Sequence, residues 1–337
     1  MKVKISNQKK PRKENVIIGT HSGIFHPDEV VAVAILCLYN EDKKIKIIRS
    51  RDIVELQKCD ILVDIGEGEF DHHQPGGNGK RDNGVPYASC GLVWRKLGEE
   101  VIRKIYFSTE GLKIKDDFEM YKLLRKKIDL EIISRVDAED NGKYWENEGI
   151  NLENNNIFSY IKTFVPAWYS FTEYDKAFKQ ALKITMKILE QVIRAKIEDY
   201  CADEKINELC QYEYDAEPDI EPYFFQNILE LPNEKIPWVN AVLDINEKND
   251  TEYIDFVIFP CLDGGWAAQC VPPSANQKFE QRVSFPEEWA GQTTKLAEIS
   301  GVEDALSCHN ELFLVRAKNK ESVKKLCAIA TEKSKRS

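Results

Sequence analysis

Four of the five histidines lie within the first 73 residues, each in a short segment that also carries an aspartate. One segment contains His21, His26 and Asp28, and another contains Asp71, His72 and His73. Two further aspartates join this set: Asp64 ends an apolar run that reads as a strand, and Asp137 closes a helical segment. Imidazole and carboxylate together suit Mn²⁺, Fe²⁺, Co²⁺ or Zn²⁺. No cysteine belongs to the set, which argues against a closed structural zinc site. The pattern predicts a site for two divalent cations.

Short apolar runs alternate with helical patterns around these segments, which is typical of parallel strands joined by crossover helices. The runs 16–19, 45–49 and 61–64 read as buried strands, and 28–39 reads as a helix. In an open α/β sheet the loops beyond the carboxyl ends of the strands meet at one crevice. The histidine and aspartate segments can therefore converge although they are distant in sequence.

Asp64 ends one of these strands, where a carboxylate can bridge two metal ions about 4 Å apart and the water between them becomes acidic. A helix that begins near Asp28 would also favour an anionic group of a substrate at its amino terminus. Further helices are expected over 89–97, with Ser89 as N-cap, over 116–136, and over a long amphipathic stretch, 174–200.

The composition of the chain changes after the long helix. Between Glu198 and Glu221 ten acids face one cation, Lys205. We therefore expect four parts: a basic tail over 1–14, a metal-binding catalytic domain over 15–200, an acidic connector over 201–222 and a smaller α+β domain over 223–333. In the last part we expect strands over 254–259, 266–271 and 312–315, and a closing helix over 322–330.

The charge balance limits the partners. The chain carries a net charge of −10, and without the six cations and one acid of the tail the remainder carries −15. Such a body is a poor match for duplex DNA, which is bound by neutralising many phosphates. No apolar run approaches the ~20 residues of a membrane span, and nine cysteines without a Cys-x-x-Cys pair indicate an intracellular, reduced protein. The cluster 9–13 fits either a nuclear address or a solvated tail.

Several motifs of the chain resemble the Myg (melanocyte-proliferating gene) family of the DHH phosphoesterase superfamily, over about residues 15–330. The matching segments are 19–29, 63–66, 71–74, 89–94, 136–142, 166–168, 265–272, 285–291, 299–302 and 308–309. The resemblance implies an α/β fold with a parallel-sheet DHH-type first domain. It also implies a metal-dependent phosphodiesterase with 3′ to 5′ exoribonuclease activity in the nucleus or the mitochondrion. The chain itself fits the nucleus or the cytoplasm.

The resemblance implies specific ligands for two divalent ions, Mn²⁺ first, with Mg²⁺, Co²⁺ or Zn²⁺ as alternatives. One ion would be held by His21, His26 and Asp64, and the other by Asp28, Asp64, His72 and Asp137. His73 would face the substrate phosphate, with Asp71 orienting its ring. The catalytic set is thus Asp64, His73 and Asp71. Glu139 and Asp140 fit equally well as acids that support the metal ligands and as an exposed acidic helix end, so their role stays open.

In the wider superfamily the second domain closes over the cleft and binds the distal end of the substrate. By position this role would fall to Gly264, Gly265, Gln269, Arg282 and His309. Family members follow the last position with a glycine-rich stretch, where this chain has residues 311–316, Glu-Leu-Phe-Leu-Val-Arg. Because close backbone approach to a phosphate needs glycine, Arg316 is the expected substitute. His309 and Arg282 fit a structural or solvated role equally well, and Trp168 and Trp266 fit packing better than base stacking.

Three functions remain in competition. The first is a two-metal nuclease that shortens single-stranded RNA from its 3′ end. The second hydrolyses a small phosphate compound such as pyrophosphate or a dinucleotide, which the acidic body favours. The third is a non-catalytic metal-binding adaptor that acts through the basic tail or the acidic connector. A homo-oligomer is compatible with each of them.

Overall fold

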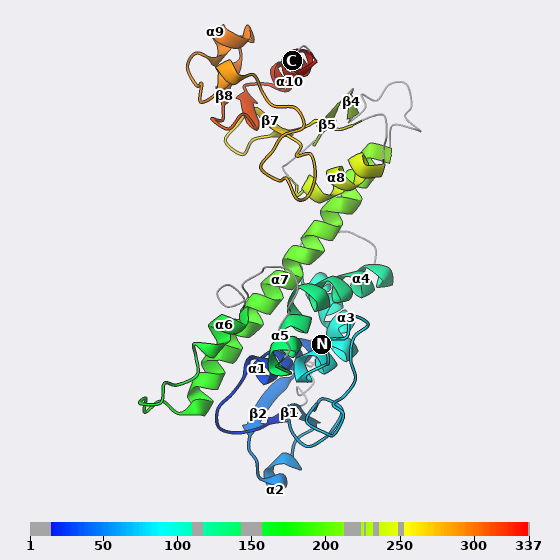
Figure 1. Cartoon of the computed structure of the whole chain (residues 1–337), viewed down its shortest axis with the longest axis vertical. Coiled ribbons are helices and arrows are strands. Elements are labelled where there is room, and N and C mark those ends of the chain that lie inside the picture. Colours follow the sequence, from blue (N-terminus) through cyan, green and yellow to red (C-terminus); the bar gives the residue numbers. More distant parts are fainter. Residues whose placement is uncertain are drawn as a thin grey trace, which may run out of the picture. The chain divides into compact units, whose positions relative to one another are not determined.

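The computed structural model describes residues 15–109, 117–142, 157–211, 224–225, 227–231, 236–248 and 253–335. It divides into two compact units, Met1–Ile197 and Glu198–Ser337, with the boundary inside one long helix (Figure 1). The basic tail and the later half of the expected acidic connector lie outside the described residues. No helix of the described part has both the length and the apolar character that crossing a bilayer requires.

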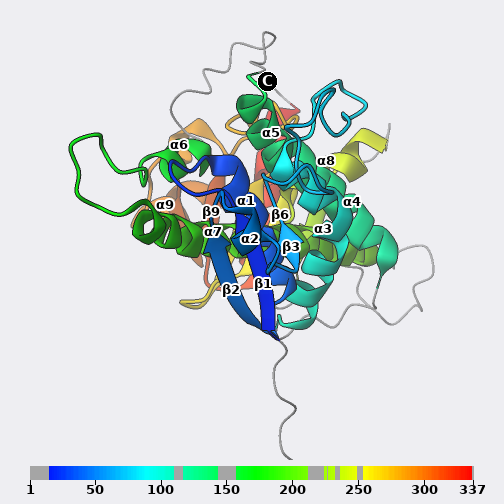
Figure 2. The same ribbon diagram turned by 90° about the horizontal axis from the view of Figure 1, so that it is seen from below.

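The first unit is built on a three-stranded parallel sheet in the order β2-β1-β3. The strands are β1 (Asn15–Thr20), β2 (Lys44–Arg49) and β3 (Ile61–Leu62). Their β-branched residues favour an extended chain. Because all three strands run the same way (Figure 2), the segments that follow them leave the sheet at its carboxyl end. Asp64, which follows β3, lies at this end.

Helix α1 (Pro27–Tyr39), buried along almost its whole length, packs against the partly buried helix α3 (Ser89–Phe107). Helix α1 begins with Pro27 at its first turn and a capping box in which the Glu29 side chain accepts a hydrogen bond from the His26 backbone N–H. Helix α3 is longer than expected, and its N-cap is Ala88 rather than Ser89. Ser89 is instead the first helical residue, and its hydroxyl donates to Asp64.

The expected helix over 116–136 is divided in three. Helix α4 (Phe118–Ile128) leads into a π-helical turn, η1 (Asp129–Ile133), and the chain continues as α5 (Ser134–Asp140). Short helices α2 (Ile53–Leu56) and α6 (Ile157–Lys162) complete the first unit together with the first part of α7 (Tyr174–Gln211). π-Helical turns are rare and concentrate at functional sites.

Helix α7 continues eleven residues past its expected end at position 200. The reason is a second apolar stripe among the acids: Cys201, Ala202, Ile206 and Leu209 are buried at helical spacing, while Glu204 and Glu208 are exposed. Ile206 and Leu209 belong to a core of the second unit that also contains Trp238. Residues 201–211, expected to be a solvated connector, are therefore a packed helix.

The second unit contains a six-stranded mixed sheet in the order β4-β5-β6-β7-β9-β8. Its strands are β4 (Phe224–Phe225), β5 (Ile228–Glu230), β6 (Phe256–Pro260), β7 (Trp266–Cys270), β8 (Ala305–Cys308) and β9 (Leu314–Ala317). Its helices are α8 (Val239–Lys248), the 3-10 turn η2 (Glu287–Trp289), α9 (Leu296–Ser300) and α10 (Lys320–Ser334). Only β5 and β6 pair in parallel among these strands.

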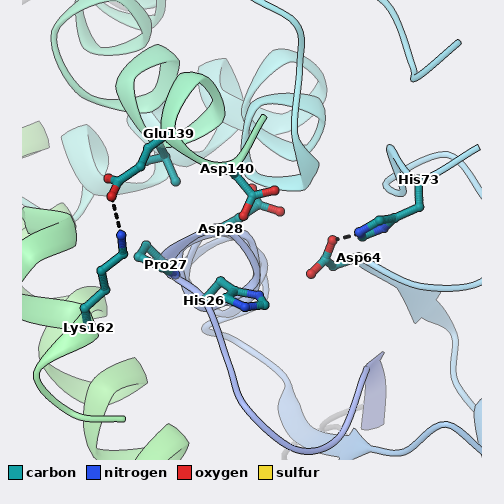
Figure 3. A pocket seen from close by; sticks show the side chains of 9 residues that line it. His26, Pro27, Asp28, Asp64, His73, Glu139, Asp140 and Lys162 are labelled. Atoms are coloured by element: carbon teal, nitrogen blue, oxygen red, sulfur yellow. Dashed lines mark hydrogen bonds and ion pairs between the residues drawn. The ribbon is translucent and has the colours of Figure 1, made fainter. Parts of the chain in front are cut away.

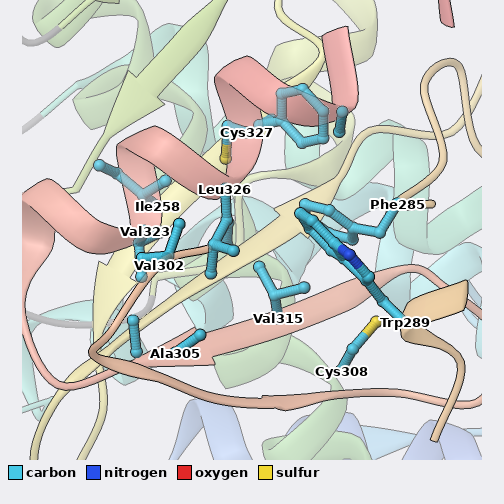
Figure 4. Close-up of a cluster of buried hydrophobic side chains, with 14 of the residues drawn as sticks. Ile258, Phe285, Trp289, Val302, Ala305, Cys308, Val315, Val323, Leu326 and Cys327 are labelled. Atoms are coloured by element: carbon cyan, nitrogen blue, oxygen red, sulfur yellow. The ribbon is translucent and has the colours of Figure 1, made fainter. Parts of the chain in front are cut away.

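Both faces of this sheet are buried, because successive residues of a strand point to opposite sides. Ile258 and Val315 pack under α10 with Trp289 (Figure 4), whereas Val257 and Phe259 pack with Trp238 and Val242 near and on α8. The expectation of an α/β chain with a parallel sheet in its first part and a separate sheet in its second part is confirmed.

Candidate metal centre

Histidines and acids from five segments meet at the edge of the parallel sheet where its strands end. These segments are the loop 21–26 after β1, the first turn of α1, Asp64 after β3, the loop 71–73 and the end of α5. The structure brings these segments together although they are distant in sequence, as the rule for parallel sheets predicts.

The first group of ligand atoms comes from His21, His26, Glu29 and Asp64, which lie within 4.8 Å of one another. His21 Nε2 is 3.1 Å from Glu29 Oε1 and 3.2 Å from Asp64 Oδ2. His21 and both acids are buried, whereas the His26 side chain is 56% exposed. A buried imidazole between two buried carboxylates is a donor set suited to a divalent transition metal.

The second group contains Asp28, His72 and Asp140, again within 4.8 Å. His72 Nε2 is 3.2 Å from Asp140 Oδ2 and 3.3 Å from Asp64 Oδ1. Asp64 thus presents one carboxylate oxygen to each group, as a bridging ligand must. The backbone of Asp64 has φ 59°, in the left-handed region that a non-glycine residue rarely adopts. Such strain is held in place by surrounding structure and concentrates at functional sites.

Asp28 is fixed by the amino terminus of α3. Its Oδ1 accepts a hydrogen bond of 2.7 Å from the Cys90 backbone N–H, and its Oδ2 accepts one of 3.0 Å from the Ser89 N–H. Backbone amides at a helix start have no partner within the helix and favour a negative charge. This contact holds the carboxylate of α1 rigidly against α3 at the bottom of the site.

Among the described residues Asp137, which the resemblance makes a ligand, groups with Asp28 and Cys90 within 4.8 Å and not with a histidine. Its Oδ2 is 2.7 Å from Arg81 Nη1, and its Oδ1 accepts from the Gly91 N–H at 3.0 Å. The other side of the Arg81 guanidinium binds both oxygens of Asp129 in η1, each at 2.7 Å. The structure therefore brings Asp140, one helical turn later in α5, to His72 instead. Asp137 forms a buried ion pair that joins α5 to α3 and to the loop at Arg81.

His73 and Asp71 lie beside the second group as a pair. Asp71 is buried, and its Oδ1 is 2.8 Å from His73 Nδ1, while its Oδ2 accepts from the Glu67 N–H at 2.7 Å. The His73 side chain is 60% exposed, and its Nδ1 is 3.5 Å from Asp64 Oδ1. This arrangement leaves one face of an oriented imidazole open to solvent, which is what a residue that meets a phosphate needs.

The clustered carboxylates raise the pKa values of two histidines in this site, and burial raises the pKa of one aspartate. Burial lowers the pKa of His21, but the neighbouring carboxylates of Asp64 and Glu29 outweigh this effect and raise that pKa to about 10. For His72, burial is likewise outweighed by Asp140 and Asp64, and its pKa rises to about 11. Burial raises the pKa of Asp28 well above its ordinary value, with the charges of neighbouring aspartates adding to the effect. The protein thus concentrates negative charge that cations must compensate.

A cavity of about 320 Å³ opens onto these groups (Figure 3). Asp28, Asp64 and Asp140 line it together with the exposed rings of His26 and His73. Lys162 of α6 closes one side through an ion pair with Glu139. The volume is at the lower end of the range for sites of small ligands.

Buried polar atoms without hydrogen-bond partners in the described part of the chain show that the donor set fits divalent metal ions. Glu29 Oε1, His72 Nε2 and Asp137 Oδ2 are buried and have no partner in hydrogen-bond geometry within the described residues, although each faces a charged group. An unsatisfied buried polar atom costs free energy, unless a ligand completes it. Glu29 and Asp140 were not assigned as ligands from the sequence. The signals for them were the capping-box spacing from His26 to Glu29 and the helical spacing from Asp137 to Asp140.

The candidate substrate residues of the second unit form two sets at opposite ends of β7. At one end Arg316 Nη2 binds Asp263 Oδ1 at 2.6 Å and the Gly264 carbonyl at 3.3 Å. A Cβ on Gly265 would lie 2.6 Å from the Ala317 carbonyl oxygen, so this turn approaches β9 closely. The tight turn needs glycine here for its own packing.

The other set lies beyond the carboxyl end of β7. Arg282 binds Asp255 at 3.2 Å and stacks over Tyr253, with its guanidinium 4.1 Å from the ring centre. His309 is exposed, stands against the Phe313 ring and accepts from the Glu311 N–H. Four residue steps of β7 separate the two ends, roughly 13 Å at the rise of a strand. Gln269 lines a separate pocket with Trp238 and Glu198.

A parallel α/β sheet whose strand-end loops form two adjoining histidine and carboxylate groups defines a candidate metal-centre protein of the α/β class. The family comparison narrows this class. The model of the MYG1 exonuclease family, described as an uncharacterised protein family (UPF0160), matches residues 17–331. The chain belongs to this family, which confirms the resemblance drawn from its motifs.

Relatives match almost the whole chain. The MYG1 protein of Chlamydia pneumoniae is 31% identical over 322 residues, covering 90% of this chain and 93% of its own. The MYG1 protein of Saccharomyces cerevisiae is 30% identical, with 93% of this chain and 95% of its own covered. A human protein named MYG1 exonuclease is 27% identical over 88% of this chain and 81% of its own. No solved structure matches the chain.

Proposed function

We propose that this protein is a divalent-metal-dependent phosphodiesterase of the DHH type that shortens single-stranded RNA from its 3′ end. The observation that carries the proposal is Asp64, which offers one oxygen to each of two adjoining ligand groups at the floor of an open cavity. The family name and the name of the human relative, MYG1 exonuclease, support a nuclease.

In this proposal His21, His26, Glu29 and Asp64 hold one ion, and Asp28, Asp64, His72 and Asp140 hold the other, with Mn²⁺ as the first candidate. When bound, such ions neutralise phosphate charge and make a water between them acidic. Asp140 takes the place that the resemblance gave to Asp137, because Asp137 is already paired with Arg81.

The remaining residues bind and orient the substrate. His73, held by Asp71, faces the cavity and donates from its exposed ring to a phosphate oxygen. Lys162 lies at the cavity wall, where its ammonium can move from Glu139 to the phosphate. Asp28 keeps its position through the α3 amides while the substrate is exchanged. In the second unit, His309 and Arg282 at one end of the sheet, or Arg316 at the other, bind the distal part of the substrate.

The test is cleavage of a 5′-labelled single-stranded RNA with Mn²⁺, comparing the wild type, Asp64→Ala and Asp82→Ala. Asp82 is an exposed acid of the first unit and serves as the matched control. We expect a ladder shortened from the 3′ end with the wild type and Asp82→Ala, and none with Asp64→Ala. Full activity of Asp64→Ala would refute the bridging role.

A second candidate is hydrolysis of a small phosphate compound such as pyrophosphate or a dinucleotide. The modest cavity of about 320 Å³ and the net charge of −10 favour it. Turnover of pyrophosphate, dinucleotides and RNA oligomers of increasing length separates the two candidates, because only the nuclease would gain from length.

A further inference from the structure

Three aromatic side chains stand exposed in the loop between α6 and α7. Trp168 is 94% exposed, Tyr169 is 71% exposed, and Phe171 is fully exposed. The rings of Trp168 and Tyr169 meet edge to face, 5.4 Å between centres. In both views this green segment projects away from the body of the first unit (Figure 1 and Figure 2). Clustered exposed aromatics mark a binding surface rather than a core.

A row of lysines follows on the first turns of α7. Lys176, Lys179, Lys183 and Lys187 are exposed, and their spacing of three and four residues puts them on one side of the helix. The row is about 16 Å long at 1.5 Å per residue. The first three have no ion pair within the described part of the chain, and Lys187 lies 3.7 Å from Glu190.

Few acids offset this lysine row, although the chain as a whole is acidic. Between positions 174 and 189 the helix has one acid, Asp175, which is bound to Arg49 at 2.7 Å. Four exposed cations on one helix face of a protein with a net charge of −10 form a local positive surface. Such a surface attracts a polyanion.

Both features are tied to the metal centre. The Arg49 guanidinium that binds Asp175 also donates to the Gly23 carbonyl, in the loop that carries His21 and His26, at 2.8 Å. At the other end of the loop, Lys162 lines the cavity six residues before Trp168. The aromatic loop therefore follows directly on the wall of the cavity, and the lysine row starts one residue after Asp175, which Arg49 joins to the loop that carries His21 and His26.

We propose that the aromatic loop and the lysine row form a track for single-stranded RNA that leads into the cavity. Bases stack on Trp168, Tyr169 and Phe171, and backbone phosphates lie along the lysines. Stacking platforms combined with a cationic groove are the usual means of holding a single strand without reading its sequence. The proposal rests on the proposed function and refines its substrate to a chain of several nucleotides.

The test measures binding separately from cleavage. Fluorescence anisotropy follows an RNA of about 12 nucleotides, within the usual site sizes of single-strand binders, in the Asp64→Ala background. A triple change of Lys176, Lys179 and Lys183 to alanine should lower the slope of log affinity against log salt by about 2, since each phosphate contact contributes roughly 0.7. The matched control changes three exposed lysines of α4 to alanine, at positions 122, 126 and 127.

The stacking part has its own variant. Trp168→Ala should weaken RNA binding about tenfold, whereas Phe118→Ala, which removes a 69% exposed ring on α4, should not. An unchanged salt slope in the triple variant, or equal losses in both lysine sets, overturns the track. Loss of binding to anionic phosphatidylserine vesicles in these variants with RNA binding intact also overturns it, in favour of a membrane contact.

A cleavage measurement keeps the two proposals apart. In the otherwise wild-type enzyme the triple lysine change should slow cleavage of the long RNA and leave cleavage of a dinucleotide unchanged. If the wild type binds the RNA with the expected lysine dependence and cleaves no phosphodiester, the track is supported and the nuclease function fails. If the wild type cleaves RNA of every length equally well with and without the lysines, the nuclease function is supported and the track fails.

Discussion

Gly91 in the first turn of α3 is the position where one added methyl group should do most damage to the centre. A Cβ built there would lie 1.8 Å from Asp137 Oδ2 and 2.8 Å from Arg81 Nη2. No real atoms approach so closely, so Gly91→Ala must drive the Asp137 carboxylate away from Arg81. The change therefore separates a pair whose side chains are 0% and 5% exposed.

The magnitude follows from two opposing effects. Breaking a buried ion pair by losing one partner costs about 3 to 5 kcal/mol. Arg81 keeps both hydrogen bonds to Asp129, which places the cost at the lower end. Alanine in place of glycine stabilises a helix by up to about 1 kcal/mol. The net expectation for Gly91→Ala is a loss of about 2 kcal/mol in the stability of the first unit.

Native-state hydrogen exchange of α3 in the metal-free protein reports the opening free energy of that unit by itself. Gly68→Ala is the control, because a Cβ at Gly68 meets nothing within 4 Å. In an Asp137→Ala background the added methyl group should cost almost nothing, since its obstacle is gone. A loss under about 0.5 kcal/mol in Gly91→Ala, within the range of ordinary surface changes, would refute the reasoning. An unchanged cost in the double variant would refute it equally.

Two further predictions concern the ligands. Asp140→Asn should lower Mn²⁺ affinity by at least about tenfold in a metal titration. Glu139→Gln, which loses only its pairing with Lys162 at the cavity wall, should leave that affinity unchanged. Equal effects of the two changes would contradict the assignment of Asp140. The raised pKa values of His21 and His72, about 10 and 11, keep both rings protonated at pH 7 without metal. Because metal ligation needs both rings neutral, metal binding should release protons and should tighten as the pH rises from 7 toward 10. Calorimetry in two buffers of different ionisation enthalpy measures the number of protons released. A metal-binding reaction without proton release would contradict this prediction.

Sequence reasoning predicted the frame of the centre well, because that frame depends on short-range patterns. Apolar runs placed β1, β2 and β3, although only β1 is largely buried and the other two strands are not, and the rule for parallel strands brought their following loops together. The histidines stand at such loops, and His21, His26, His72 and Asp64 lie within the predicted cluster. For His21 and Asp64 this prediction required only that a strand be recognised and its end located.

The choice between Asp137 and Asp140 could not be made in the same way. Both lie in one acidic helix end, and which carboxylate faces the histidines depends on Arg81, which is distant in sequence and occupies Asp137. The substrate residues of the second unit failed to gather for a related reason. Gly264 lies just before β7, whereas Arg282 is hydrogen-bonded to Val271, just after the other end of β7. The pairing of the strands, and not membership of a motif, decides where each residue lies.

The π-helical turn η1 makes the composition of the candidate centre depend on how this helix is wound as well as on residue type. A π-turn holds one more residue than an α-turn, so α5 follows α4 with a shifted phase. If the same residues were wound as regular α-helix, without the π-turn, α5 would be rotated about the helix axis relative to α4. Asp140 would leave His72 and Asp137 would leave Arg81, with every ligand still present in the sequence. The winding of this one turn therefore decides which acids of α5 face the candidate ligands, as much as the residue types do.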